Sequence, residues 1–356
     1  MFPQYICAMK LLSHGYKAQS FVLSLFILSF AAIPCACLYG QFDISLQESV
    51  TVLLDFFTGS PVQGMRESTI LNILINIRLP RVLAAMLCGG GLALAGAILQ
   101  GALRNPLADP FTLGISAGAA CAASLVIALP IHAVTGLDQN ILVSAAAMFG
   151  AMFALFATIL LGRGTGTLDR ESIILAGVAV AAFLGALIAL IKALNEESVT
   201  SIVFWIMGSL QGITWRSLPI LLITLAPGLV AAIWGWRKLD AISLGDEESY
   251  SLGINAGMAR LYLLLGASLM TAGCVSIAGI IGFVGLVAPH MLRILMGPGH
   301  GLLMGASFPA GALLLLCADC IGRSILSGGQ ELPVGVVTAL LGGPFFAWLV
   351  WKRASE

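Results

Sequence analysis

The chain has 356 residues, of which 59% are apolar, with only 17 basic and 17 acidic residues. Its mean hydropathy is +1.01. Soluble domains carry about 25% charged residues, so this composition excludes a soluble globular protein and indicates a chain that spans a membrane. The formal net charge of zero also argues against nucleic acid as a partner, because no excess of basic residues would neutralise the phosphates.

Nine stretches without a charged residue are each long enough to cross a bilayer as a helix, which takes about 20 residues. They are residues 18–42, 82–103, 110–137, 139–162, 172–191, 217–236, 261–292, 294–318 and 332–351. Three glycines and Pro289 interrupt 261–292 and leave room for one full helix and one short helix. We therefore expect an all-α polytopic membrane protein with about ten transmembrane helices, rich in Gly and Ala, in a single transmembrane domain over residues 1–356.

The distribution of basic residues predicts the orientation. Lys10 and Lys17 precede the first stretch, which is too long for the apolar part of a cleaved signal peptide. With the N-terminus in the cytoplasm and ten spans, eleven basic residues lie inside and six lie outside, in agreement with the positive-inside rule. Both termini are then cytoplasmic. The six outside are Arg66, Arg78, Arg81, Lys192, Arg216 and Arg323.

Two internal segments are more polar than the stretches beside them. Residues 198–215 are uncharged, rich in Ser, Thr, Gly and Gln, and contain two Trp, which favours an interfacial or re-entrant segment on the outer side. Residues 237–256 are the most hydrophilic internal segment, and the orientation above places them in the cytoplasm. This second segment is either a plain loop or a docking surface.

A weak internal repeat is present. A shift of 183 residues places eight identical residues, mostly Gly and Pro, within the 29 positions of Gly90–Gly118 and Gly273–Gly301. Both copies combine a Gly-rich helix with a Pro-interrupted one, which points toward a transport pathway. An odd number of spans between the copies predicts an inverted repeat. Chance alignment in a chain rich in Gly and Ala is the alternative.

The residues after the second stretch interrupt the chain. Asn105-Pro106 and Asp109-Pro110 each place a residue before a proline, which disfavours the helical conformation. Irregular backbone at membrane depth occurs only against protein or a water-filled cavity. The segment is therefore either part of a gate or a plain loop between two helices.

Two sequence patterns typical of enzymes are absent. The chain has no phosphate-binding GxxxxGK[ST] and no HExxH sequence. We expect His290, on one face of a short helix with Arg293, to be a packing or interface residue, and the spacing of Asp319 and Arg323 predicts a local ion pair. Ionisable residues are nearly absent from the spans, which argues against a membrane enzyme and against a carrier coupled to protons or sodium.

Three passages carry a resemblance to a known family. They are RLPRVLAAMLCGGGLALAGAILQGALRNPLADPFTLGISAGA (78–119), SIAGIIGFVGLVAPHMLRILMGPGH (276–300) and ELPVGVVTALLGGPFFAWLV (331–350). With SLGDEESYSLGI (243–254) between them, their order, spacing and Pro and Gly positions resemble the FecCD-type permeases of ABC importers for iron-siderophores, haem and cobalamin, which are type II importers. The match covers about residues 70–351.

The resemblance implies a set of partners. A second permease chain, expected to be an identical copy, would form the translocation path with this one inside the surrounding membrane lipid. Two separate ATPase subunits on the cytoplasmic side would bind ATP and Mg, so this chain would hold no cofactor and no metal. A periplasmic or lipoprotein substrate-binding protein would deliver the ligand from outside. The implied location is the bacterial or archaeal cytoplasmic (inner) membrane.

The same resemblance implies three groups of site residues. Docking of the binding protein is assigned to Arg78, Arg81 and Arg323. The inner gate is assigned to Asn105, Pro106 and Leu107. Coupling to the ATPase is assigned to Leu244, Gly245, Asp246, Glu247, Ser251, Leu252 and Gly253, which makes 237–256 the cytoplasmic coupling segment.

The expected function is import of a ferric siderophore, or of haem or cobalamin, by alternating access driven by the ATPase subunits. The chain is then not an enzyme, because ATP hydrolysis belongs to a separate chain. An ion-coupled secondary transporter acting without an ATPase is the alternative. The polar segment 237–256 discriminates between the two, since an ATPase-driven permease requires a coupling segment and a carrier does not.

Overall fold

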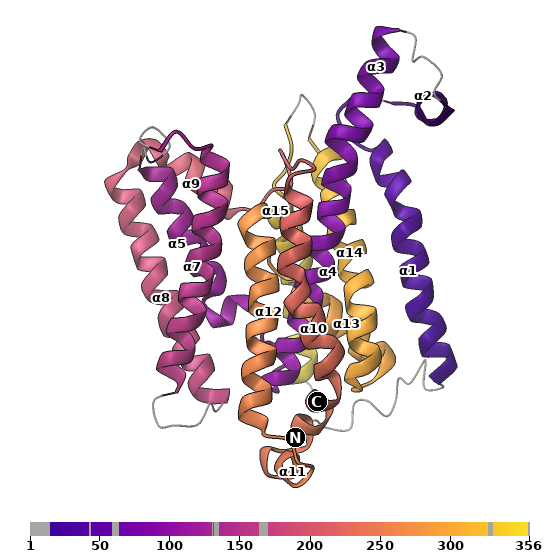
Figure 1. The fold of residues 1–356 in the computed structure, drawn as a ribbon. Helices are drawn as coiled ribbons and strands as arrows, with labels where there is room; N and C mark the ends of the chain where they lie inside the picture. Colours follow the sequence, from indigo (N-terminus) through magenta and orange to yellow (C-terminus); the bar gives the residue numbers. More distant parts are fainter. Residues whose placement is uncertain are drawn as a thin grey trace.

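The computed structural model describes residues 15–42, 44–58, 64–129, 131, 135–163, 170–326 and 330–354. Within these ranges every regular element is a helix, which confirms the expected all-α class. The long helices form a bundle, with the short helix α11 (Asp246–Ser251) at one end and α3 (Met65–Asn72) at the other (Figure 1). We refer to these as the α11 end and the α3 end.

The first helices of the bundle are α1 (Gly15–Leu38), α2 (Leu46–Thr58) and a continuous helical rod. The rod combines α3, six residues of π-helix (η2, Ile73–Arg78) and α4 (Leu79–Ala102), and it is 38 residues long. Pro80 lies in the first turn of α4, where the missing N–H of proline is tolerated. The rod runs from the α3 end toward the α11 end (Figure 1).

A group of helices on one side of the bundle contains α5 (Ile115–Ala128), α7 (Gln139–Gly162), α8 (Arg170–Leu194) and the short α9 (Val199–Ile206) (Figure 1). A 3-10 turn, η4 (Glu196–Ser198), joins α8 to α9. The helix α5 is shorter than the uncharged stretch 110–137 suggests, because the 3-10 turn η3 (Pro110–Leu113) and Gly114 precede it. Gly114 has a φ of +75°, a left-handed conformation that glycine adopts without a steric penalty.

The second half of the chain forms α10 (Ser217–Leu244), α11, α12 (Ala256–Ala278), α13 (Val284–Met296), α14 (His300–Ser324) and α15 (Val334–Ala354). The predicted division of 261–292 into one full and one short helix is confirmed. The break falls between α12 and α13, where Phe283 has a φ of +67°. A right-handed helix cannot continue through that conformation.

The helix α4 is the most enclosed of the long helices. In the most apolar part of its rod 83% of residues are buried, compared with 28% in α8. It packs against α10, α12, α13 and α14. Glycines permit the close contacts, because a Cβ on Gly89 would overlap the backbone of Gly311 in α14, and a Cβ on Gly96 would overlap the backbone of Gly285 in α13.

Seven helices in the described ranges are long and apolar enough to cross a membrane, and three shorter apolar helices lie at Ile115–Ala128, Val284–Met296 and Val334–Trp348. Together they agree with the expected number of about ten. The helix α1 begins at the α11 end, and the C-terminus lies at that same end (Figure 1). Lys10 lies outside the described residues, and the cytoplasmic placement of the termini stays a prediction.

The structure refines the predictions for the two polar segments, 198–215 and 237–256. In 198–215 the eight residues of α9 are too few to cross a bilayer, as an interfacial or re-entrant segment requires. In 237–256 the first eight residues continue α10 as far as Leu244. The connection between α10 and α12 is therefore shorter than the hydrophilic sequence suggests, and it consists of α11 and the residues beside it.

The two copies of the weak repeat begin in α4 and α12, which run in opposite directions. Arg260, near the start of α12, donates from Nε to the carbonyl of Ala102 at the end of α4, at 3.1 Å. Opposite directions are what an inverted repeat requires. The local geometry is shared in part: Gly114 and its counterpart Gly297 both have positive φ, whereas η3 has no counterpart 183 residues later in the chain.

Candidate functional site

The segment Leu244–Gly253 links α10 to α12 at the α11 end (Figure 1). The helix α11 has six residues and begins with three acidic ones, whose charges are favourable at a helix N-terminus. Gly253 ends the segment with a φ of +77°. The Asn255 side chain then accepts a hydrogen bond from the Met258 N–H at 3.0 Å and starts α12. The segment is thus a defined helical turn held at both of its ends.

The surface of this segment is apolar as well as acidic. Leu244, Tyr250 and Leu252 are 67%, 77% and 61% exposed. Asp246 and Glu247 are also exposed. Exposed apolar side chains grouped beside polar ones are typical of protein interaction sites, so the predicted coupling residues, apart from the buried Gly245, lie where a partner can contact them.

The predicted gate residues lie in the loop between α4 and η3. Asn105 folds this loop onto itself, because its side-chain oxygen accepts from the Leu107 N–H and its carbonyl accepts from the Ala108 N–H, both at 3.0 Å. Arg104, just before it, has a φ of +47°, which residues other than glycine rarely adopt. The loop is therefore compact, with one backbone position in an unfavourable conformation.

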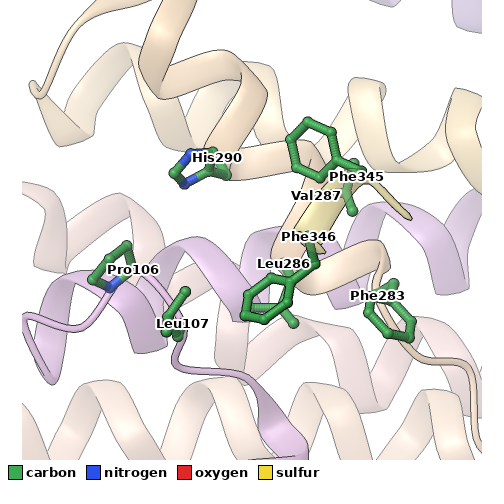
Figure 2. A pocket seen from close by; sticks show the side chains of 8 residues that line it. All are labelled: Pro106, Leu107, Phe283, Leu286, Val287, His290, Phe345 and Phe346. Atoms are coloured by element: carbon green, nitrogen blue, oxygen red, sulfur yellow. The ribbon is translucent and has the colours of Figure 1, made fainter. Parts of the chain in front are cut away.

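Pro106 and Leu107 line a small apolar pocket together with side chains of α13 and α15 (Figure 2). The other lining residues are Phe283, Leu286, Val287, His290, Phe345 and Phe346. The ring of Phe345 stands edge-on to that of His290, with centroids 6.2 Å apart, which agrees with a packing role for this histidine. The gate loop thus meets α13 and α15 at one place.

Asp246 joins the coupling segment to the gate loop. Its Oδ1 lies 3.2 Å from Nη2 of Arg104, the neighbour of Asn105, and its Oδ2 lies 3.1 Å from Nη2 of Arg260 in α12. The Arg260 side chain is 1% exposed, whereas that of Asp246 is 50% exposed. The coupling segment therefore contacts the loop that carries the predicted gate residues, through the arginine directly before them.

Arg78, Arg81 and Arg323 are all buried near the α3 end, with exposures of 5%, 9% and 3%. Arg81 forms ion pairs with Asp319, from Nη2 to Oδ1 at 2.8 Å, and with Glu331, from Nη1 to Oε2 at 2.7 Å. These contacts connect α4 to α14 and to the residues before α15. The Asp319 side chain itself is 1% exposed.

Arg323 pairs with the same aspartate, as the i, i+4 spacing predicts, with Nη2 at 3.0 Å from Oδ2 of Asp319. It also donates to the Tyr39 carbonyl at 3.1 Å. Arg78 donates to the carbonyls of Cys37 and Leu38 at 2.8 and 2.9 Å. The three arginines therefore bind groups of their own chain, and their docking role stays a prediction.

Sequence reasoning missed three members of these networks: Arg104, Arg260 and Glu331. A usable signal was present, because each of them directly adjoins one of the uncharged stretches, at 82–103, 261–292 and 332–351. Charged groups close to the ends of membrane spans are either solvated or paired within the protein. The sequence does not distinguish these two cases, whereas the structure shows pairing.

The comparison with known families identifies the chain. Residues 24–352 match the model of the FecCD transport family. The chain belongs to the FecCD transport family. FecCD proteins are permease subunits of ABC importers, and a separate chain hydrolyses the ATP. This chain is accordingly a transport subunit and not an enzyme, as the resemblance of its three passages implies.

The names of proteins similar to this FecCD protein specify different ligands. It is 38% identical over 291 residues to the hemin transport permease HmuU of Yersinia pestis, covering 80% of this chain and 85% of that one. It is 36% identical over 294 residues to the cobalamin import permease BtuC of Halobacterium salinarum, covering 83% and 77%. Because these identities are nearly equal, similarity to named relatives does not identify the ligand.

A solved structure supports the fold. An inward-facing metal-chelate type ABC transporter superimposes with a TM-score of 0.77 and 28% identity, covering 94% of this chain and 99% of that chain. The family, the membrane permease function and the all-helical fold are therefore consistent with one another. An ABC importer permease requires ATPase and substrate-binding partners, and an ion-coupled carrier is not favoured.

Proposed function

We propose that this chain imports a metal chelate or tetrapyrrole, with ferric siderophore, haem and cobalamin as the candidate ligands. The observation that carries the proposal is the FecCD match over residues 24–352. The names of similar permeases, which include hemin, cobalamin and Fe(3+)-citrate systems, support this ligand class as a whole. Ferric siderophore is the leading candidate within the class.

The α11 end is cytoplasmic in this proposal. Two ATPase subunits bind the segment Leu244–Gly253 there, and they bind the ATP and Mg. A second copy of this chain completes the translocation path in the cytoplasmic membrane, and both termini are cytoplasmic. The exposed apolar side chains beside acidic ones on this segment support the assignment, because a partner would bury them.

A periplasmic or lipoprotein binding protein docks at the opposite, α3 end. The burial of Arg78, Arg81 and Arg323 sets a condition on this part of the proposal. Arg81 and Arg323 must first release Asp319 or Glu331, and can then bind acidic groups of the binding protein. Charge reversal in Arg323→Glu should then weaken the complex by at least about tenfold, measured as the Kd for the purified binding protein. An unchanged Kd would remove this arginine from the interface.

Asn105, Pro106 and Leu107 form the inner gate in this proposal. The pocket that they line with α13 and α15 would open when the ATPase subunits move the coupling segment. Rigid helices transmit such a movement, so the bundle alternates between its two sides. Because the lining is apolar, ligand selectivity would reside in the binding protein.

The deciding experiment is uptake into proteoliposomes that contain this chain, its ATPase and its binding protein. Labelled ferric siderophore, haem and cobalamin are compared side by side, with ATP and with a non-hydrolysable analogue. We expect uptake of one ligand, and only with ATP and both partners present. Uptake by this chain alone under an ion gradient would instead establish the secondary transporter.

A variant of the coupling segment separates binding of the ATPase from its effect. A bulky residue in Gly245→Trp should uncouple ATP hydrolysis from uptake, because the φ of +156° at this position is one that residues with side chains rarely adopt. The measurement is the ratio of ligand imported to ATP hydrolysed. A wild-type ratio would count against the coupling role of this segment.

A further inference from the structure

One carboxylate at the α11 end is shared by two arginines from different parts of the chain. Asp246 lies in α11, Arg104 in the loop after α4, and Arg260 in α12. The Nη2 of Arg260 donates to both oxygens of Asp246 at 3.1 Å, and the Nη2 of Arg104 donates to Oδ1 at 3.2 Å. Asp246 is thus in simultaneous contact with the gate loop and the bundle.

The bundle side of this arrangement is anchored. Arg260 is 1% exposed, and its Nε donates to the carbonyl of Ala102, the last residue of α4. A cation at the C-terminal end of a helix is favourable. Removing a buried guanidinium from its partners is costly, so Arg260 holds a constant position between α4 and α12.

The loop side is less constrained. Arg104 adopts a left-handed backbone conformation that ordinarily costs about 1 kcal/mol or more and persists where neighbouring contacts hold it. Its guanidinium is tied to Asp246, and Asn105 to Leu107 follow it directly. A shift of Asp246 therefore reaches the gate residues through one side chain.

The side chain of Asp246 is more exposed than those of its two arginine partners. The Asp246 side chain is 50% exposed, that of Arg104 is 15% exposed, and that of Arg260 is 1% exposed. The carboxylate faces the side on which an ATPase subunit would bind, and both guanidinium groups face the protein. A partner that contacts α11 can thus displace the carboxylate without reaching either arginine.

We propose that Asp246 relays movement of the coupling segment to the gate loop through its ion pair with Arg104, while Arg260 serves as the fixed point against which it moves. This relay rests on the proposed function, in which α11 contacts the ATPase and residues 105–107 form the gate. It assigns to Arg104 a positioning role, and to Asp246 a role beyond binding of the partner.

The test uses the assembled transporter in proteoliposomes and compares Asp246→Asn with Glu171→Gln. The asparagine keeps one oxygen for Arg260 but loses the charge that holds Arg104. Glu171 is exposed in the first turn of α8, so its substitution removes a carboxylate without touching the relay. At a saturating concentration of the ATPase, we expect the amount of ligand imported per ATP hydrolysed to fall about fivefold or more in Asp246→Asn, and Glu171→Gln to retain the wild-type ratio.

A double-mutant cycle tests the contact itself. Arg104→Gln should lower the same ratio, and the double variant Arg104→Gln with Asp246→Asn should be no worse than the more affected single variant. Independent, additive losses would overturn the relay. So would an unchanged ratio in Asp246→Asn, or a loss of ATPase binding that accounts for the whole effect, since the aspartate would then only hold α11 in place.

The failure of the relay differs from the failure of the proposed function. If the wild-type complex shows no ATP-driven uptake of ferric siderophore, haem or cobalamin, the proposed function fails before the variants are compared. If the wild type transports and the ratio is insensitive to Asp246, the proposed function stands and the relay is wrong.

Discussion

The two ends of the bundle contain the same motif, an aspartate between two arginines, in opposite environments. At the α3 end Asp319 joins Arg81 to Arg323, and its side chain is 1% exposed. At the α11 end Asp246 joins Arg104 to Arg260, and its side chain is 50% exposed. Arg81 has a second carboxylate, Glu331, but the main difference between the two ends is the exposure of the shared aspartate to water.

That difference predicts different roles. Asp319 lies in a long helix that packs closely on α4, and displacing it would leave the buried Arg323 without its carboxylate and Arg81 with Glu331 alone. Asp246 lies in a six-residue helix, and water can solvate its half-exposed carboxylate when it leaves its partners, while Arg260 keeps the Ala102 carbonyl. The α3 end is therefore expected to be held in one arrangement, while the α11 end is free to respond to a partner.

The largest expected effect is that of Asp319→Ala. Removing one member of a buried ion pair typically costs about 3–5 kcal/mol, because the other charge is left uncompensated. We expect a marked loss of thermal stability for the purified permease in detergent. Cys317→Ala, on an exposed position of the same helix, serves as the control, with a change within about 0.5 kcal/mol. Equal stabilities of the two variants would contradict the comparison.

An intermediate effect on stability is expected for Asp246→Asn. The Asp246 side chain is half exposed, which reduces the contribution of its ion pairs, and asparagine keeps one oxygen for Arg260, so the same thermal measurement should show a much smaller change than for Asp319→Ala. Equal losses of thermal stability in Asp246→Asn and Asp319→Ala would contradict the comparison between the two ends. It is sharpened if Asp246→Asn leaves stability nearly intact while it alters the ratio of ligand imported to ATP hydrolysed.

The smallest effect is expected at an exposed pair, Glu48 in α2 and Arg66 in α3, which are 2.8 Å apart. The hydrogen bond from Arg66, with those from Ser45, lowers the pKa of Glu48 to about 2. A lowered pKa means that the pair stabilises the contact above the ordinary pKa of a glutamate, and that this contribution is lost as the pH falls toward 2.

Spin labels at Thr51→Cys and Ser68→Cys, in a chain without its native cysteines, measure the separation of α2 and α3. The distance distribution should stay constant from pH 8 to pH 5 and broaden only near pH 3 and below. Glu48→Gln should broaden it at every pH. A distribution that broadens at pH 5 in the unsubstituted pair would show that Arg66 does not hold this carboxylate.

Much of the fold was predictable because the signal is local. Uncharged stretches mark the spans, and the glycines before Pro289 mark the break between α12 and α13. The pair of Asp319 with Arg323 was foreseeable for the same reason, since four residues separate them. No local pattern predicts that Arg81 and Arg323 share Asp319, or that Asp246 joins Arg104 to Arg260, because helix packing alone brings those residues together.

The elements α2 and α3 were not predicted. Their sequences carry charges at Glu48, Asp55, Arg66 and Glu67, so the criterion that detects membrane spans passes over them. Burial of the three arginines at the α3 end was also unforeseen. Their excess on the side that the charge rule disfavours suggested a partner outside the chain, whereas the chain itself supplies the acceptors.

The burial of α4 shows that a helix apolar enough to insert into a membrane need not face lipid in the folded protein. The most apolar part of its rod has a mean hydropathy of 2.2, so it is apolar enough to insert among acyl chains, yet in the finished bundle most of it faces other helices. Contacts with acyl chains are then replaced by glycine-mediated packing. Changes in bilayer thickness or lipid composition should consequently act on the permease through exposed helices such as α8, while the centre of the bundle stays insulated from them.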